Sequence, residues 1–402
     1  MRQVSVRMRV CVAGLAGAVL GAPAAWAQQG SDGDLIADGR LRYEHVAQDN
    51  LSDANAVTLR LRLGYEQPLT RQFKVLGEVE GVALLEDDFA DTVRVRPGQA
   101  VVLDPEALEI NRLQAQWTGD NGLTATVGRQ RIILNNARFI GNVGFRQNEQ
   151  TFDAGRLAYR AGEKLSLNYI YIDKVRRILG DDSPNGEWRS DSHVVQADVK
   201  TGAGDFSAYG LLLDFDNAAA QSSATYGLRW THTVAAAPYK FAIGAEFATQ
   251  SDYGANPAAF DLSYFAANIG VTRGGWRGGV GAEVLEGDGA RGFATPLATL
   301  HAFQGWADVF LTTPSDGIRD LNATVSWTDE TPAFGKALTL TARAHDFAAE
   351  SGGADFGQEL DFLAQAKINQ HWAIEAKAAF YDGDDPRYAD RTKVWLALEM
   401  TY

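Results

Sequence analysis

Residues 57–66 read VTLRLRLGYE, a segment in which apolar and polar side chains alternate. The apolar side chains are Val57, Leu59, Leu61, Leu63 and Tyr65, and the polar ones are Thr58, Arg60, Arg62 and Glu66. Successive side chains of a β-strand point to opposite faces of the sheet. The segment therefore predicts a strand with one face against an apolar medium and the other against water.

The same alternation recurs along most of the chain and predicts eighteen strands. It is clear in residues 35–45, 57–65, 73–85, 165–172, 193–200, 224–231, 239–249, 276–284, 320–327, 338–345, 359–368, 373–380 and 392–402. It is weaker in residues 108–117, 123–133, 152–159, 206–215 and 262–271. An even number of antiparallel strands is typical of bacterial outer-membrane barrels.

The connections between the predicted strands alternate in length. Short turns are expected at residues 67–72, 118–122, 160–164, 201–204, 234–238, 272–275, 329–335 and 369–371. Longer loops fall between them, notably at residues 86–105, 135–151, 173–191 and 286–317. This rhythm predicts an all-β transmembrane barrel with short periplasmic turns, long extracellular loops and both termini in the periplasm.

The beginning of the chain has the features of a targeting segment. Basic residues precede an apolar run at residues 10–22, and Ala25-Trp26-Ala27 follows as a small-residue cleavage site. This order predicts a signal peptide of residues 1–27 and a barrel domain of residues 28–402. The run is too short to span a bilayer as a helix, and no later stretch reaches 18 consecutive apolar residues.

The last predicted strand carries a separate signal. Its outward side chains are Val394, Leu396, Leu398, Met400 and Tyr402, and the sequence stops on that aromatic residue. Such an ending resembles the C-terminal assembly signal of outer-membrane barrels. We therefore expect the barrel-assembly machinery to be a partner of this strand.

Composition and motifs argue against several classes of function. The chain has 37 basic and 51 acidic residues, and its net charge of −14 argues against a nucleic-acid partner. The one cysteine, Cys11, lies in the predicted signal peptide. The sequence contains no G-x-S-x-G elbow, no H-E-x-x-H motif and no phosphate-binding loop, and its histidines lack metal-ligand spacing. We predict a protein that is not an enzyme, with no catalytic residue, metal site or cofactor.

Arginines on the strands are predicted to face the lumen, because a cation on the lipid face costs about 2 to 4 kcal/mol at the midplane. The predicted solute pathway comprises Arg40, Arg42, Arg60, Arg62, Arg112, Arg129, Arg131, Arg138, Arg146 and Arg156. Guanidinium groups pair bidentately with carboxylate and phosphate, so this row favours anions. The predicted counter-charges are Glu44, Glu78, Glu80 and Asp153. Pairing with them would brace the barrel wall, and both roles fit the sequence.

Two stretches resemble the alginate export porin family. The first contains Gly128-Arg129-Gln130, Arg138-Phe139-Ile140-Gly141, Phe145-Arg146-Gln147-Asn148 and Thr151-Phe152-Asp153-Ala154, followed by Arg156. The second contains Gly292-Phe293-Ala294-Thr295-Pro296-Leu297, then His301, Phe303, Gly305, Trp306 and Asp308. The resemblance implies an eighteen-stranded barrel whose arginine-rich lumen passes a polyuronate such as alginate.

The predicted function is passive diffusion or export of anionic small molecules or polysaccharides. Loop 135–151 is the candidate constriction, because its apolar residues Phe139, Ile140 and Phe145 would be poorly placed on a solvated tip. The expected location is the outer membrane of a Gram-negative cell, where a monomer contacts lipid and lipopolysaccharide. Two alternatives fit the sequence less well: an envelope structural or adhesion barrel closed by its loops, and a secreted β-sandwich that binds a ligand.

Overall fold

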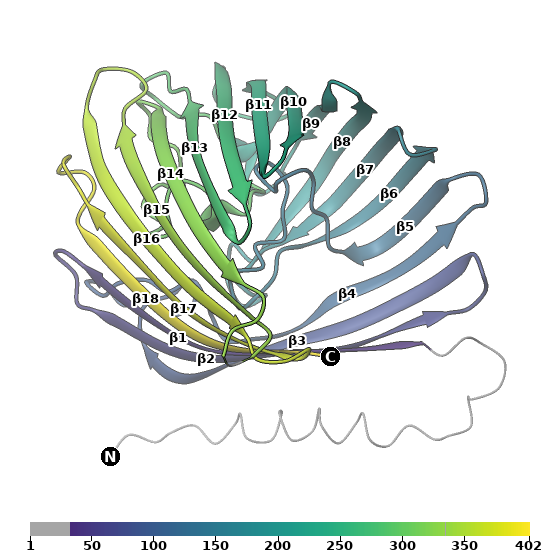
Figure 1. The fold of residues 1–402 in the computed structure, drawn as a ribbon, viewed down its shortest axis with the longest axis horizontal. Helices are drawn as coiled ribbons and strands as arrows, with labels where there is room; N and C mark the ends of the chain where they lie inside the picture. The colour runs from purple at the N-terminus through teal and green to yellow at the C-terminus, as the bar shows by residue number, and fades with distance from the viewer. Residues whose placement is uncertain (1–32, 334) are drawn as a thin grey trace.

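The computed structural model describes residues 33–402 except residue 334, and these form one sheet of eighteen strands (Figure 1). The strands are β1 (Asp34–Gln48), β2 (Ala54–Pro68), β3 (Phe73–Asp88), β4 (Ala107–Thr118), β5 (Leu123–Gln130), β6 (Thr151–Ala161), β7 (Leu165–Arg176), β8 (Glu187–Thr201), β9 (Gly204–Leu213), β10 (Ser223–Ala236), β11 (Tyr239–Asp252), β12 (Asp261–Arg273), β13 (Trp276–Leu285), β14 (Ile318–Asp329), β15 (Ala337–Ala348), β16 (Asp355–Lys367), β17 (Trp372–Asp382) and β18 (Arg391–Thr401). The predicted signal peptide, residues 1–27, lies outside the described residues. Within the described part of the chain, no helix is long and apolar enough to cross a membrane.

The sheet closes on itself. Each strand pairs antiparallel with the next strand in the chain, and β1 also pairs with β18, where Leu41 lies opposite Leu398. Closure leaves no strand with a free edge, which a sheet inside a bilayer requires. The prediction of an eighteen-stranded antiparallel barrel is confirmed, and each predicted strand overlaps one observed strand.

The boundaries of one weak prediction were wrong. The segment 123–133 was expected to be one strand, but β5 ends at Gln130. From Arg131 the chain leaves the wall and enters the lumen, so its backbone no longer pairs with β4 or β6.

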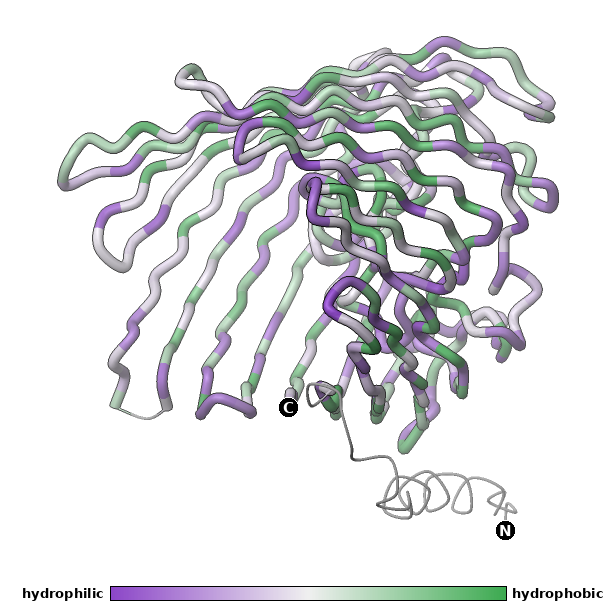
Figure 2. Tube along the Cα trace, turned by 90° about the vertical axis from the view of Figure 1, so that its right-hand side faces the viewer, coloured by the Kyte–Doolittle hydropathy of each residue, from purple (hydrophilic) through white to green (hydrophobic). Residues whose placement is uncertain are grey.

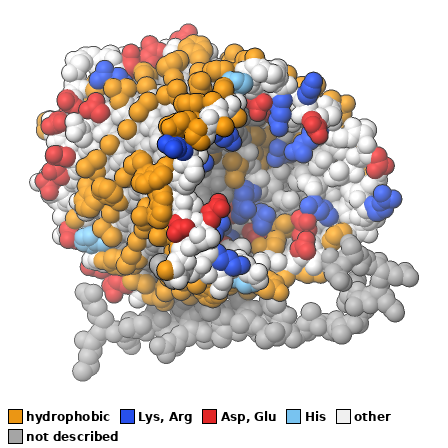
Figure 3. Space-filling view, viewed as in Figure 1, with side chains coloured by type: hydrophobic (Ala, Val, Ile, Leu, Met, Phe, Trp, Pro, Cys, Tyr) orange, Lys and Arg blue, Asp and Glu red, His pale blue; other side chains and the backbone are white. Residues whose placement is uncertain are grey.

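Alternation along the strands gives the barrel two different faces. On the outer face Leu108, Val280 and Leu396 are 59%, 57% and 52% exposed. On the inner face Arg42 of β1 and Arg60 of β2 are buried. Figure 2 shows this exchange of hydrophobic and hydrophilic residues along the strands, and Figure 3 shows hydrophobic side chains over the outer wall. The outside is therefore suited to hydrocarbon and the inside to charged groups.

The two longest loops at the long-loop end, which is the extracellular end in this type of barrel, pack inside the barrel. Residues 131–150 join β5 to β6, and residues 286–317 join β13 to β14. A parallel bridge joins Ile140 of the first loop to Leu297 of the second. Their apolar side chains share one buried cluster with lumen-facing wall residues such as Ile170 and Leu262. The hydrophobic core of the molecule therefore lies within the lumen.

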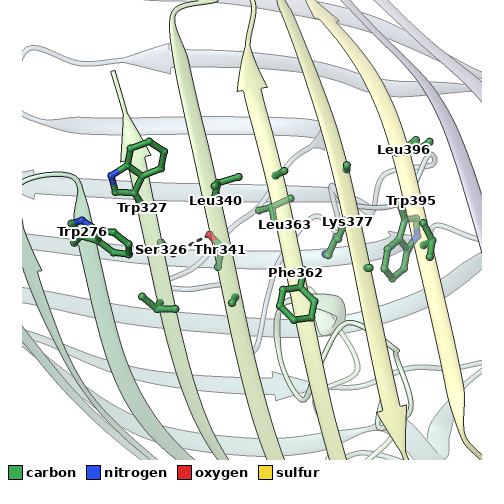
Figure 4. A pocket seen from close by; sticks show the side chains of 16 residues that line it. Trp276, Ser326, Trp327, Leu340, Thr341, Phe362, Leu363, Lys377, Trp395 and Leu396 are labelled. Atoms are coloured by element: carbon green, nitrogen blue, oxygen red, sulfur yellow. Dashed lines mark hydrogen bonds between the residues drawn. The ribbon is translucent and has the colours of Figure 1, made fainter. Parts of the chain in front are cut away.

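The outer wall also carries a shallow apolar groove. It has a volume of about 750 Å³ and is lined by Trp276, Trp327, Leu340, Phe362 and Leu396, among others (Figure 4). These large side chains occupy lipid-facing positions, whereas Leu363, Lys377 and Trp395, which also line the groove, belong to the inner face. The groove is a feature of the membrane-facing surface and not part of the passage.

Candidate functional site: the loop-lined constriction

The loop of residues 131–150 crosses the lumen and is fixed to the far wall. The Oδ1 atom of Asn135 accepts hydrogen bonds from Gln196 on β8 and Ser207 on β9, each at 3.2 Å. Further along, Nε of the fully buried Arg138 donates to Glu283 on β13 at 2.6 Å. Arg138 also donates to Thr295 and Gln304 of the second loop. One guanidinium thus ties both loops to the barrel wall.

The tip of this loop is held by arginines of the first two strands. Arg40 donates to the carbonyl oxygens of Gly144 and Phe145 at 3.2 and 2.9 Å, and Arg42 also donates to Phe145. Arg62 lies 3.3 Å from the carboxylate of Glu149 and also pairs with Glu80. These guanidinium groups are therefore occupied by loop backbone and carboxylates.

A third extracellular segment, residues 89–105, supplies one of those carboxylates. Phe89, Ala100 and Val102 form a small separate core with Val46 and Ala54 at the ends of β1 and β2. This packing places the fully buried Asp104 against Arg42, and Asp104 also accepts the backbone N–H of Gln147 at 2.8 Å.

A buried network of charges joins the first loop to the second. Arg146 lies 3.2 Å from Glu44 and 2.8 Å from Asp308, and Lys393 of β18 lies 2.8 Å from Asp308. His301 completes the network, with Nδ1 2.7 Å from Asp308 and Nε2 2.5 Å from the ammonium of Lys377. The ring of Phe145 stacks on His301 at 3.5 Å between centroids.

Protonation states in this network follow from its packing. Burial lowers the pKa of His301 to about 3, so the imidazole is neutral and donates through Nδ1. Burial alone would raise the pKa of Asp308, but the His301 hydrogen bond and the charges of Lys393 and Arg146 hold it well below its usual range. Burial opposes ionisation of Glu149 too, yet Arg131 and Arg62 lower its pKa to about 2. The carboxylates of Asp308 and Glu149 are therefore charged at neutral pH.

The predicted counter-charges all pair with basic side chains. Glu44 pairs with Arg42 and Arg146, Glu78 with Arg112, Glu80 with Arg62, and Asp153 with Arg129. Arg60 pairs with Asp38, and Arg131 pairs with Glu149. The exposed fractions of Arg42 and Arg60 are only 2%, so these two arginines contact protein atoms and not the solution in the lumen.

Arg129 and Asp153 do not lie where the sequence placed them. Gly128 and Gln130 pair with Ala154 and Phe152, which are buried inside, so the residues between them point outward. There Arg129 binds Asp153 at 2.7 Å on the same face as the lipid-facing Val127. The lumen prediction for this pair was wrong because the pair lies at the extracellular ends of β5 and β6, where a cation on the outer face costs only about 0 to 1 kcal/mol.

Some predicted arginines do reach the lumen. The side chains of Arg131, Arg112 and Arg40 are 32%, 15% and 14% exposed. Arg156 also points inward, and within the described chain its guanidinium hydrogen-bonds only to the amide oxygen of Asn168, at 2.7 Å. In Figure 3 lysine and arginine side chains gather around the hollow that opens toward the viewer. The space left beside the loops therefore has basic groups on its wall.

Several residues of the constriction were missed in the sequence. They are Asp104, Glu149, Glu283, His301, Asp308, Lys377 and Lys393. His301 and Asp308 lie in the second motif, which was the one available signal. The others are single charged residues in loops or in the C-terminal strands, and alternation alone does not show which of them meet the inserted loops.

A closed antiparallel barrel with an apolar outside, a charged inside and inserted loops has the architecture of an outer-membrane porin. Solved structures support this class. The chain superposes on Acinetobacter baumannii OccAB4 with a TM-score of 0.74, at 16% identity over 93% of this chain and 99% of that chain. It superposes on Pseudomonas aeruginosa OpdL with a TM-score of 0.70, at 17% identity over 92% of this chain and 99% of that chain. On P. aeruginosa OccK9 (OpdG) the TM-score is 0.72, at 16% identity over 92% of this chain and 99% of that chain.

These likenesses show a shared fold. No family model matches the chain, and no curated protein matches it. The resemblance to the alginate export porin family is therefore not confirmed, whereas the porin barrel itself is.

Proposed function

We propose that the chain is an outer-membrane channel through which small anionic organic solutes, carboxylates above all, diffuse passively. The observation that carries this proposal is the set of guanidinium groups that reach the lumen beside the constriction, at Arg40, Arg112, Arg131 and Arg156. Guanidinium forks match carboxylates in geometry and charge. One solved structure of this fold, P. aeruginosa OpdK, contains vanillate, which is a carboxylate.

Uronate oligomers such as alginate belong to the same chemical class and form the narrower version of this proposal. Passive diffusion follows the concentration gradient, so the same channel serves import or export. The second candidate is a structural or adhesion barrel with a closed lumen. The apolar core that the two inserted loops build inside the barrel favours it.

Reversal potentials across planar bilayers under a salt gradient test both candidates. A channel with a positive excess at its wall should prefer anions, whereas a barrel closed by its loops should carry no current. A unit charge about 4 Å from a permeating ion contributes about 1 kcal/mol in bulk water. Replacing Arg131 and Arg156 with glutamine should therefore lower the anion-to-cation permeability ratio about fivefold or more, most strongly at low salt.

Arg129 provides the matched control, because it lies on the outer face only two residues from Arg131. Its replacement with glutamine should leave the permeability ratio unchanged. An equal fall for Arg129→Gln would show that the lumen charges do not set selectivity.

Membrane orientation makes a separate prediction. Pro184 and Ala290 lie exposed in long loops, while Asn121 lies in the short turn between β4 and β5. Epitope tags inserted at Pro184 or Ala290 should bind antibody on intact cells, and a tag at Asn121 should bind only after the outer membrane is opened. Antibody binding at Asn121 on intact cells would contradict the proposed orientation.

A further inference from the structure

Asparagine and glycine alternate across four neighbouring strands on the inner face of the wall. In register, Gly244 of β11 lies opposite Asn268 of β12, Asn268 opposite Gly281 of β13, and Gly281 opposite Asn322 of β14. The residues next to the asparagines, Ile269 and Leu321, are 49% and 45% exposed on the outer face. Both amides therefore point into the lumen.

Each of these amides lies over a glycine. A methyl group added at Gly244 would lie 3.0 Å from Nδ2 of Asn268, and one added at Gly281 would lie 3.0 Å from Oδ1 of Asn322. Neither amide hydrogen-bonds to another group in the described residues, although each carries donors and an acceptor. The glycines thus give the two amides room to lie along the wall with their polar edges free.

The row lies directly beside the constriction. Gly281 is two residues along β13 from Glu283, the residue that anchors Arg138 of the first loop at 2.6 Å. The step from Glu283 to Gly281 leads toward the short turns, because β13 begins at that end. A solute that has passed the loops on this side of the lumen meets the two amides next.

The adjoining wall is rich in uncharged hydrogen-bonding groups. Toward the short turns β14 and β15 present Thr324, Ser326 and Thr341, and the hydroxyls of Ser326 and Thr341 bond to each other at 2.9 Å (Figure 4). The basic side chains nearest in register are His345, which lies opposite Asn322 and is bound to Asp320 at 2.9 Å, and Arg343, which lies opposite Thr324 with Asp361 of β16 on its other side. Amides and hydroxyls on this wall can hydrogen-bond to the hydroxyl groups of a solute, and the arginines of the lumen can pair with its carboxylate.

We propose that Asn268 and Asn322 form a subsite that hydrogen-bonds the hydroxyl groups of carboxylate solutes, so that the channel favours polyhydroxylated carboxylates over unsubstituted ones of equal charge and length. This inference rests on the proposed function, because it assigns specificity within an anion channel. A site that supplies hydrogen bonds to a hydroxyl discriminates against the analogue that lacks it.

The test compares glucarate with adipate as blockers of the chloride current through single channels. Both are six-carbon dicarboxylates, and only glucarate carries hydroxyl groups. In the double variant Asn268→Ala, Asn322→Ala the half-blocking concentration of glucarate should rise about threefold to tenfold, the range expected for one or two neutral hydrogen bonds. The half-blocking concentration of adipate should not change. Assembly should be unaffected, because neither amide bonds to the described part of the protein.

Two further variants sharpen the test. Gly281→Ala should displace the amide of Asn322 without removing it and should weaken the glucarate block by a smaller factor. Gln114→Ala removes a lumen-facing amide from β4, half-way around the barrel, and should change neither block.

The outcomes separate the inference from the function on which it rests. A protein that conducts anions but shows the same glucarate block with and without the two asparagines overturns the subsite alone. Equal shifts for glucarate and adipate also overturn it, because they would reflect altered width or charge. A protein without anion current overturns the proposed function and the subsite together.

Discussion

Replacing Arg146 with alanine is expected to loosen the tip of the loop of residues 131–150 and to widen the passage. Arg146 is 4% exposed and lies within 4 Å of carboxylate oxygens of Glu44, Asp104 and Asp308. Removing one partner of a buried ion pair costs about 3 to 5 kcal/mol, because the other charge stays desolvated and unpaired. We expect the lower end of this range, since Lys393 and Arg42 still face the three carboxylates.

Single-channel recording and thermal unfolding in detergent would measure this effect. The variant should show higher and noisier conductance than the wild type, because the loosened tip of the loop would move within the lumen. Arg131→Ala is the matched control from the same loop. Its partner Glu149 keeps Arg62 at 3.3 Å and Asn111 at 3.0 Å, so the current noise and the stability should change much less, although the lost charge should lower anion selectivity. Equal effects of the two variants would show that the buried network does not hold the constriction.

The barrel was predictable from the sequence because a membrane imposes one rule on every strand. Each wall residue faces either hydrocarbon or the lumen, so a strand such as residues 57–66 shows the two environments as alternating residue types. The closing pair of β1 and β18 obeys the same rule, with Leu41 opposite Leu398 outside and Arg40 opposite Glu399 inside. Strand number and fold class followed from repeating this reading along the chain.

The contacts of the constriction were less predictable, because they join residues far apart in the sequence and leave no periodic pattern of residue types. Arg138 and Glu283 are separated by 145 positions and meet only because the loop crosses the lumen. Asp104 reaches Arg42 through the packing of a third loop. The prediction for Arg129 failed for a different reason. The alternation rule placed it outside with Val127, but the expectation that every strand arginine faces the lumen overrode that rule.

The inserted loops also change the role of the N-terminal arginines, because they bring further carboxylates into contact with them. Of the predicted counter-charges, Glu44 pairs with Arg42 and Glu80 pairs with Arg62. In the structure Asp38, Asp104, Glu149 and Glu399 add further negative charge beside Arg40, Arg42, Arg60 and Arg62. Bracing therefore dominates for Arg42, Arg60 and Arg62, and the lumen field depends on the more exposed groups at Arg131 and Arg156.

Replacing Leu396 with arginine on the closing strand is expected to lower the yield of assembled barrel sharply. Leu396 is 52% exposed on the outer face at the centre of β18. An arginine on the lipid face costs about 2 to 4 kcal/mol at the midplane and about 0 to 1 kcal/mol near the interfaces. The loss should be several times larger at Leu396 than nearer the membrane interface.

Met400→Arg is the matched control, because Met400 lies on the same face of the same strand but pairs with Trp372 at the short-turn end. Heat-modifiable mobility on gels and urea unfolding in lipid vesicles measure both variants. Glu399→Gln changes the inner face, where Arg40 can still donate to the amide oxygen, and should cost little. Equal losses for Leu396→Arg and Met400→Arg would contradict the depth of the strand in the bilayer, and a loss for Glu399→Gln as large as that for Leu396→Arg would contradict the assignment of its two faces.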